Sequence, residues 1–188
     1  MKLVLGLTGA NAAGKGEVAS HLRARGFTVH SLSDVVRDEA AARGLPPERE
    51  HLIRIGNLLR ENAGPGVLAE RILPRLGRRD VVDSIRNPAE VDVLRGLPHF
   101  VLLGVRAPIE LRFERSLSRG RPGDPTTLER FELREQQENS SDPAAQQLAA
   151  TFAMADREID NDTGLDSLRD RLDRLLAALE AVSERPSR

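Results

Sequence analysis

The sequence predicts an α/β fold in which a five-stranded parallel sheet is covered by helices on both faces. Short apolar segments alternate along the chain with longer segments of helical periodicity, which is the pattern of parallel strands joined by helical crossovers. One segment, residues 100–105, is apolar throughout, as expected for a strand buried on both faces. A length of 188 residues suits a single domain with a full-sized core.

Turn and capping residues separate the expected strands from the expected helices. Gly26 ends the first helix, and Ser33 with Asp34 is expected to cap the second. The last helix carries a stripe of leucines opposite Arg and Asp. The expected strands are residues 3–5, 27–30, 80–83, 100–105 and 158–160. The expected helices are residues 14–26, 35–43, 48–61, 67–76, a segment opening at Asn87 or Pro88, 108–118, 127–138, 143–154 and 165–179.

Composition excludes several classes of function. The net charge of −1 provides no basic excess for non-specific nucleic-acid binding, so no nucleic-acid partner is expected. The absence of cysteine excludes disulfides, thiolate zinc sites and thiol catalysis. No secretion signal is recognisable and no apolar stretch approaches ~18 residues, so we expect a soluble, cytoplasmic protein without a membrane partner. The oligomeric state stays open, with a homodimer as one option.

Residues 6–17 have the pattern of a phosphate-binding loop. Gly9 and Gly14 bracket four residues ahead of Lys15, so the backbone can fold into a nest whose N–H groups point at an anion. The helix that begins near Gly14 directs the positive end of its dipole to the same place, and Lys15 adds a mobile charge. The alternative is a glycine-rich turn with a surface lysine. The expected donor-binding residues are Gly9, Asn11, Ala12, Ala13, Gly14, Lys15, Gly16 and Glu17.

The ligands of a bound Mg²⁺ must differ here from those that a phosphate-binding loop usually provides. Gly16 stands where a Ser or Thr hydroxyl would hold Mg²⁺ directly. Asp83 ends an apolar strand, and we expect its carboxylate to order Mg²⁺ through bound water. The alternative role of Asp83 is to cap the helix that follows.

Two arginines follow neighbouring strands at the edge where parallel sheets bind ligands. Arg37 lies on the first turn after the second strand, and Arg86 lies three residues after Asp83. Each guanidinium could grip an acceptor phosphate through two parallel hydrogen bonds. Either arginine could also be an ordinary surface residue.

Three segments carry a resemblance to P-loop nucleoside monophosphate kinases. Residues 14–16 read Gly-Lys-Gly as in adenylate-kinase-like enzymes, residues 33–37 resemble their Gly-Asp-x-x-Arg segment, and residues 83–86 resemble their Asp-Gly-Phe-Pro-Arg segment. The chain is most similar to the P-loop domain that precedes some deoxycytidylate deaminases and to stand-alone adenylate-kinase-like proteins, over nearly its whole length. Dephospho-coenzyme A kinases resemble it at the loop, at Asp34 and over the final strand and helix.

This resemblance implies a three-layer P-loop NTPase fold in one domain with two working inserts. An acceptor-binding helical insert would span about residues 34–76, and a small arginine-rich lid would span about residues 119–142. The lid arginines would close on the transferring phosphoryl group, although Glu110 and Glu114 could instead neutralise them in a salt-bridged outer face. The implied catalytic residues are Lys15, Asp83, Arg86, Arg115 and Arg119, with Arg121 as a further lid arginine. The implied substrate-binding residues are Asp34, Arg37, Asn57, Arg60, Arg86 and Arg134.

The resulting functional hypothesis is an ATP- and Mg²⁺-dependent kinase for a small-molecule acceptor, a nucleoside or deoxynucleoside monophosphate. One alternative is a non-catalytic nucleotide-binding regulatory module. Another is a dephospho-coenzyme A kinase-like enzyme, in which Asp34 would act as a base. Deaminase chemistry is excluded because the zinc-binding cysteines are absent. The four histidines show no metal-ligand spacing and no partner acid in the sequence, so no role is assigned to them: His21, His30, His51 and His99.

Overall fold

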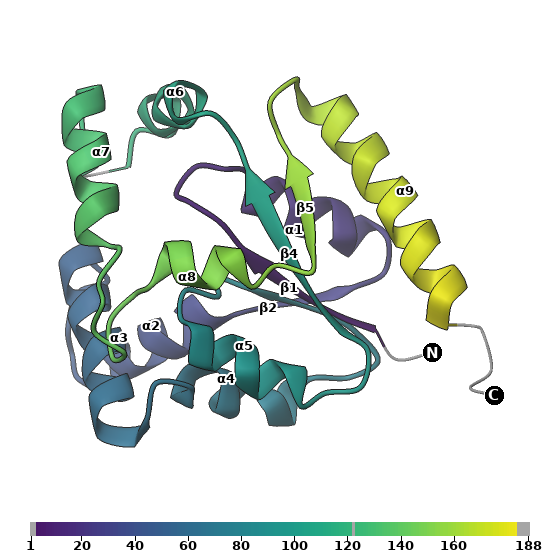
Figure 1. Cartoon of the computed structure of the whole chain (residues 1–188). Helices are drawn as coiled ribbons and strands as arrows, with labels where there is room; N and C mark the ends of the chain where they lie inside the picture. Colours follow the sequence, from purple (N-terminus) through teal and green to yellow (C-terminus); the bar gives the residue numbers. More distant parts are fainter. Residues whose placement is uncertain (1–2, 122, 184–188) are drawn as a thin grey trace.

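A computed structural model describes residues 3–121 and 123–183. Within these ranges the chain forms a five-stranded sheet with the order β2-β3-β1-β4-β5, and every neighbouring pair is parallel. The predicted α/β fold with a five-stranded parallel sheet is therefore confirmed (Figure 1). The strands are β1 (Leu3–Thr8), β2 (Thr28–Ser31), β3 (Arg79–Asp83), β4 (Phe100–Arg106) and β5 (Arg157–Asp160).

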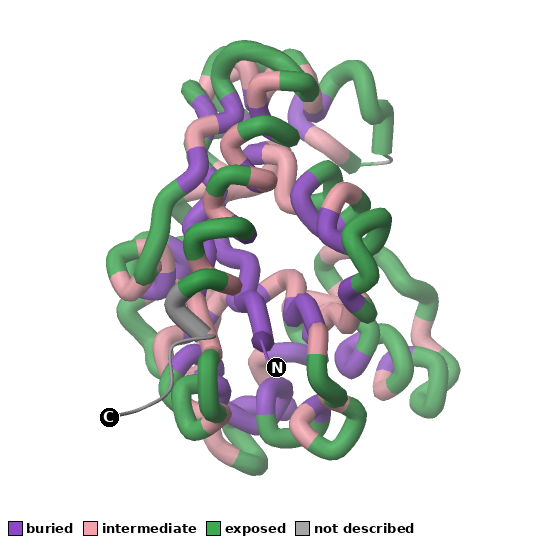
Figure 2. The backbone as a smooth tube through the Cα atoms, turned by 90° about the vertical axis from the view of Figure 1, so that its right-hand side faces the viewer, coloured by how far each residue is buried: buried purple, intermediate pink, exposed green. Residues whose placement is uncertain are grey.

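Helices cover both faces of this sheet. The described helices are α1 (Lys15–Ala24), α2 (Leu32–Ala42), α3 (Arg49–Ala63), α4 (Val67–Ile72) with the short 3-10 turn η1 (Leu73–Arg75), α5 (Pro88–Arg95), α6 (Ile109–Arg119), α7 (Leu128–Gln137), α8 (Leu148–Ala153) and α9 (Leu165–Ser183). The central strand β1 is buried along its whole length, whereas the edge strands β2 and β5 and the outer turns of the helices are largely intermediate or exposed (Figure 2). None of the described helices is both long enough and apolar enough to cross a bilayer.

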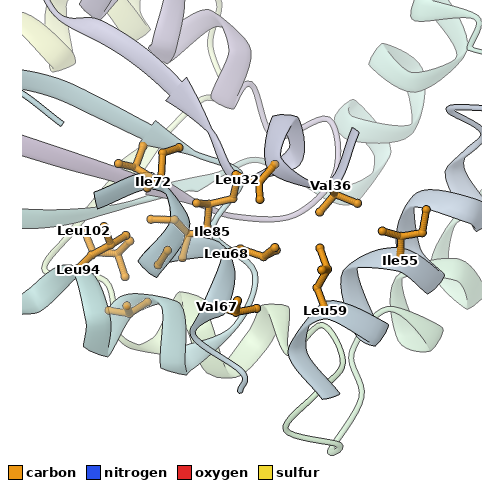
Figure 3. Packing of buried hydrophobic residues seen from close by; sticks show 14 of the residues in the cluster. Leu32, Val36, Ile55, Leu59, Val67, Leu68, Ile72, Ile85, Leu94 and Leu102 are labelled. Atoms are coloured by element: carbon orange, nitrogen blue, oxygen red, sulfur yellow. The ribbon is translucent and has the colours of Figure 1, made fainter. Parts of the chain in front are cut away.

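The core consists of two apolar clusters, one on each side of the central strand β1. Side chains alternate across a strand, so Leu5 and Leu7 pack toward α1 and α9, whereas Val4 packs toward α2, α4 and α5. Figure 3 shows the cluster on the side of α2, α4 and α5, in which Leu68 and Leu102 are fully buried. Burying each such leucine contributes roughly 1.5–3 kcal/mol. The strands are therefore held rigidly, and the loops at their carboxyl ends inherit this rigidity.

The register brings the ends of β1 and β3 to the same edge of the sheet. Gly6 of β1 is paired with Val82 of β3, one residue before Asp83. Beyond β3 the chain stays attached to β1, because Ile85 N donates to Leu7 O at 3.2 Å. The phosphate-loop segment and the residues after β3 consequently lie side by side.

The start of α2 differs from the sequence expectation. Ser33 and Asp34 do not cap this helix. The cap is Ser31, whose extended backbone lets its Oγ accept a hydrogen bond from Ser33 N at 3.3 Å. Asp34 lies inside the first turn, where its charge favours the helix dipole.

The helix expected at 143–154 begins only at Leu148. Tertiary hydrogen bonds hold the preceding segment in an irregular form: Asn87 Nδ2 donates to Pro143 O at 2.7 Å and to Ala145 O at 2.9 Å. Gln147 N also donates to Arg86 O at 2.8 Å. These contacts connect the segment before α8 to the chain that follows β3.

Candidate active site

The loop between β1 and α1 folds back on the lysine that ends it. Lys15 Nζ donates to Gly9 O at 2.6 Å and to Ala10 O at 2.9 Å. Gly9 and Gly14 have φ of 137° and 105°, which are values that glycine adopts without steric cost. The two bracketing glycines therefore take the positive φ values that let this loop turn back on Lys15.

Neighbouring strands require the absence of side chains at two positions of the loop. A Cβ on Gly9 would overlap Val105 O of β4, and a Cβ on Gly14 would overlap Nδ2 of Asn161. At Gly16, in contrast, no atom lies within 4 Å of the Cβ position. The loop is thus fitted tightly into the sheet edge at its two bracketing glycines and is open at Gly16.

Burial changes the ionisation of the loop lysine. Loss of hydration, assisted by the nearby charge of Arg86, lowers the pKa of Lys15 to about 8, whereas Asp83 acts in the opposite direction. An ammonium with this pKa is still protonated at neutral pH but is poorly hydrated. A polyphosphate would relieve this lack of hydration and counter-charge.

Asp83 ends β3 beside this lysine and retains an unused acceptor. Ser84 Oγ donates to Asp83 Oδ2 at 3.3 Å. The other carboxylate oxygen, Oδ1, is buried and has no hydrogen-bond partner among the described residues. Asn87, not Asp83, caps α5, and Glu90 completes a capping box there. An unpartnered carboxylate oxygen next to a phosphate loop is a suitable acceptor for metal-bound water, so the donor set fits Mg²⁺.

Arg86 reaches from the end of β3 toward the phosphate loop. Its Nη1 donates to Gln146 Oε1 at 2.8 Å, and its Nη2 lies 3.4 Å from Asn11 Oδ1. Glu138 Oε2 lies 3.6 Å from the same guanidinium. Burial lowers the pKa of Arg86, while Glu138 acts to raise it. The guanidinium is thus partly desolvated and lies against Asn11 of the phosphate loop.

The expected partner of Arg86, Arg37, lies elsewhere. Arg37 donates to Asp34 Oδ1 at 2.6 Å on the surface of α2, where both side chains are more than half exposed. The arginine that joins Arg86 is Arg49 at the start of α3, because both contact Glu138. The sequence reasoning missed Arg49 and Glu138, since neither belongs to a recognisable local motif.

Arginines of α6 contact the phosphate loop and its supports rather than Glu110 and Glu114. Arg112 is buried, donates to Asn11 O at 3.3 Å and forms an ion pair with Glu135 of α7. Arg115 Nη2 donates to Asn161 O at 3.0 Å. Arg115 Nη1 is buried and has no partner among the described residues.

Asn161, directly after β5, is a third residue that sequence reasoning missed. It is 2% exposed, and its Nδ2 donates to Ala13 O at 2.8 Å. It therefore links the phosphate loop to Arg115. Its position at the carboxyl end of a strand, where parallel sheets place ligand-contacting residues, was the available signal.

The remaining lid arginines are held by acidic and carbonyl groups of the lid itself. Arg119 donates to Asp124 Oδ2 at 2.9 Å, and Arg134 donates to Gly123 O at 2.8 Å. Burial and then the charge of Arg119 lower the pKa of Arg121, with smaller contributions from Arg37 and Arg49. Arg121 therefore lies on the side of the lid that faces α2 and α3.

Two candidates on α3 have different environments. Arg60 is 4% exposed, and its Nη2 donates to Glu90 Oε1 at 2.7 Å, so it is bound in a buried ion pair. Asn57 lines a groove of about 610 Å³ together with Leu45 and Ile53. Its Oδ1 is buried without a partner among the described residues. Asn57 therefore lines the groove and keeps an unsatisfied acceptor, whereas Arg60 is committed to its ion pair.

Partner acids for two of the histidines come from distant parts of the sequence. His21 Nε2 lies 2.7 Å from Asp173 Oδ1, and His30 Nε2 lies 3.0 Å from Asp80 Oδ1. The expectation that no acid lies nearby was therefore wrong, because it considered sequence neighbours alone. No cluster of three or more metal-ligating side chains occurs in residues 3–121 and 123–183.

Several solved structures have the same fold. The protein TT1252 from Thermus thermophilus superposes with a TM-score of 0.63 at 23% identity and covers 95% of this chain and 98% of its own. Shikimate kinase from Bacteroides thetaiotaomicron superposes with a TM-score of 0.59 at 14% identity, covering 93% and 98%. Shikimate kinase from Aquifex aeolicus gives 0.56 at 15% identity, covering 97% and 99%. These structures share with this chain the parallel sheet and its flanking helices.

Sequence relatives cover almost the whole chain, although no family model matches it. A UPF0200 protein of Hyperthermus butylicus is 36% identical over 182 residues, which are 95% of each protein. A UPF0200 protein of Halobacterium salinarum is 35% identical over 191 residues and covers 97% of each. A UPF0200 protein of Pyrococcus abyssi is 35% identical over 169 residues, covering 85% of this chain and 88% of the relative. By these identities and coverages, the chain belongs to the UPF0200 family.

Proposed function

We propose that this protein is an ATP-dependent kinase that transfers the γ-phosphoryl group to the phosphate of a nucleoside or deoxynucleoside monophosphate. The observation that carries the proposal is the pairing of two anion-binding arrangements at one sheet edge. The glycine loop with Lys15 forms the first, and Arg86 with Arg49 forms the second, with Asn11 in contact with Arg86. A donor polyphosphate at the loop and an acceptor phosphate at the arginines would then lie next to each other.

The donor side would bind ATP through backbone groups of residues 9–16. Lys15 would move from the carbonyls of its own loop to the outer phosphates of the nucleotide. Asp83 would hold Mg²⁺ through water at its unpartnered oxygen. Bound Mg²⁺ supplies charge neutralisation at the phosphates. Arg115 would use its unpartnered Nη1 on the nucleotide side, next to Asn161.

The acceptor side would combine an anion clamp with the groove on α3. Arg86 would bind the acceptor phosphate, and Asn57 would contact its base or sugar. Residues 34–76 would form the acceptor-binding insert. Residues 119–142 would form the lid, in which Arg119 and Arg134 exchange their present partners for phosphoryl oxygens. No general base is needed, since an acceptor phosphate is already a nucleophile and catalysis rests on positioning and charge neutralisation.

A regulatory nucleotide-binding module is the second candidate function. Gly16 provides no hydroxyl for Mg²⁺ and leaves open space at that position. Such a protein would bind ATP without turning it over. The third option, a hydroxyl acceptor activated by Asp34, receives no support from the geometry, because this exposed carboxylate is paired with Arg37.

A turnover assay tests the proposal. The purified protein is incubated with Mg-ATP and a panel of ribo- and deoxyribonucleoside monophosphates and dephospho-coenzyme A, and ADP formation is followed. We expect turnover with one monophosphate and its loss, by at least about 100-fold, in Lys15→Ala and Arg86→Ala. Arg23→Ala, which removes an exposed arginine of α1, is the matched control. Tight ATP binding without turnover on the whole panel would contradict the proposal and support the regulatory module.

A further inference from the structure

Glu138, which directly follows the last residue of α7, is a buried carboxylate held by donors from three other parts of the chain. It is 7% exposed. Its Oε2 accepts a hydrogen bond from Asn11 Nδ2 of the phosphate loop at 2.7 Å, and its Oε1 accepts one from Arg49 Nε at 3.1 Å. Arg86 Nη1 lies 3.6 Å from Oε2. One carboxylate thus occupies the point where two guanidiniums and an amide converge (the Glu138 cluster).

Charge within the Glu138 cluster itself is incompletely balanced, and the carboxylates of Asp83 and Glu90 act on Arg86 only from outside the cluster. Two guanidiniums share one carboxylate, and the 3.6 Å separation from Arg86 exceeds a hydrogen bond. The closer contact of Arg86, at 2.8 Å, is to the neutral amide of Gln146. A phosphate monoester carries up to two negative charges and three acceptor oxygens, so it would satisfy both guanidiniums better than a carboxylate does.

We propose that Arg49, Arg86 and the Asn11 side chain form an oxyanion site for the acceptor phosphate, which Glu138 occupies until that phosphate displaces it. This inference rests on the proposed function and adds Glu138 as the resident carboxylate that the acceptor phosphate must displace. Displacement of Glu138 also frees Asn11 of the phosphate loop and the end of α7. Binding of the acceptor phosphate is thereby coupled to rearrangement beside the donor site.

The substrate class follows from this competition. A ligand must supply a strong anion to replace the resident carboxylate, because an uncharged hydroxyl would leave both guanidiniums without a counter-charge. The site therefore selects phosphomonoesters and discriminates against the corresponding unphosphorylated nucleosides.

Phosphate titration of a glutamate variant tests the inference without nucleotide. Inorganic phosphate is titrated calorimetrically into the wild-type protein, Glu138→Gln and Glu132→Gln. Glu132 lies exposed on the same helix and gives a matched change of charge. We expect Glu138→Gln to bind phosphate about tenfold more tightly, because a charged competitor is removed, and Glu132→Gln to stay within about twofold of the wild type.

The double variant Glu138→Gln/Arg49→Ala tests whether the gain in phosphate affinity arises at this site or at the phosphate loop. Among the described residues, the hydrogen bonds and ion pair of Arg49 are to Glu138 and not to the phosphate loop. The gain in affinity should be lost in the double variant. Unchanged or weaker phosphate binding by Glu138→Gln would overturn the inference, as would a gain that survives the loss of Arg49. If Glu138→Gln does not fold, Glu138→Asp, whose shorter side chain retracts the carboxylate, should produce a smaller gain, and its absence would equally overturn the inference.

This titration and the turnover assay can fail separately. Phosphate binding requires neither ATP nor catalysis, so a protein that shows the gain but phosphorylates no monophosphate has the oxyanion site without the proposed activity. A kinase that phosphorylates a monophosphate but shows no gain in Glu138→Gln has the activity without Glu138 as the competitor.

Discussion

The two sides of the candidate active site are built in different ways. The donor side is a continuous segment, and its lysine is held by carbonyls five and six residues earlier in the chain. The acceptor side joins Arg49 and Glu138, which are 89 positions apart, with Arg86 from a third segment. Backbone geometry thus forms the first site, whereas ion pairs across the fold form the second.

This difference determines what each side tolerates. A loop made of backbone groups depends on glycine positions and on the atoms packed against them. A site made of arginines depends on the acidic residues that keep those arginines in place when no ligand is bound. The acceptor side should therefore lose stability on substitution, whereas the donor side should lose affinity.

Breaking the buried ion pair that supports the acceptor side, through the contact of Glu90 with Arg86 N, should have the largest effect. Arg60→Met leaves Glu90, which is 0% exposed, without its guanidinium partner. An unpaired buried carboxylate should lower the free energy of unfolding by about 3 kcal/mol, as measured by urea denaturation. ATP affinity of the folded protein should change little, since Arg60 does not contact the donor loop.

The double variant Arg60→Met/Glu90→Gln is the control for this prediction. Neutralising the carboxylate should recover at least half of the lost stability, because the amide oxygen introduced at position 90 could still accept a hydrogen bond from Arg86 N, as Glu90 Oε2 does at 2.9 Å. A loss below about 1 kcal/mol in Arg60→Met would instead contradict the assignment of this ion pair as a buried structural contact.

Breaking the donor side should have the next largest effect. Gly14→Ala places a methyl group against Asn161 Nδ2 at a φ of 105°. We expect ATP affinity to fall at least about 100-fold in an equilibrium titration, because strain of a few kcal/mol displaces the loop.

Gly26→Ala is the matched control for Gly14→Ala. Gly26 also has positive φ, 86°, but no atom lies within 4 Å of its Cβ position at the end of α1. Its substitution should cost about 1–2 kcal/mol of stability and leave ATP affinity unchanged. Equal losses of affinity in both variants would attribute the effect to general destabilisation rather than to the contact with Asn161.

The smallest expected effect is the pH dependence of ATP affinity, which tests the donor side alone. The pKa of Lys15 is lowered to about 8, chiefly by burial. Its ammonium is therefore present below this pH and is lost as the pH rises through it, so ATP affinity should fall about tenfold between roughly pH 7 and pH 9. Fluorescence titration at each pH measures this change.

Lys15→Arg separates the lysine from other ionisable groups. A guanidinium stays charged throughout this range, so the variant should show a flat profile even if its affinity is lower. A wild-type profile that is flat, or a variant with the same slope, would contradict the assignment to Lys15.

Helix ends that depend on contacts within a few residues could be predicted from the sequence, whereas an end that depends on distant residues could not. Gly26 ends α1 through contacts within a few residues and was predicted from the sequence. The start of α5 was predicted only as Asn87 or Pro88, with Asp83 as an alternative cap, and the structure shows that Asn87 is the cap. The helix expected at 143–154 was not readable, because hydrogen bonds from Asn87 and Arg86, more than fifty residues away, keep its first part irregular.

The same rule applies to the site residues. The conformation of the loop from Gly9 to Lys15 could be predicted, because the spacing of its glycines indicates where the backbone takes positive φ. The pairing of Arg37 with Arg86 was predicted from their positions after neighbouring strands. Such a position does not determine the direction in which a long side chain points. Arg37 turned to Asp34, three residues earlier, and Arg49 took the place beside Arg86.

By itself, the amino-acid sequence determined the parallel α/β architecture and the phosphate loop, because hydrophobic periodicity and glycine spacing act over a few neighbouring residues. Only the tertiary structure decided which arginines lie beside the phosphate loop. It also decided that Arg60 forms an ion pair with Glu90 and that Glu138 contacts both Arg49 and Arg86. Charged side chains are long and can pair with many partners, so the selection among those partners is made by packing of distant elements.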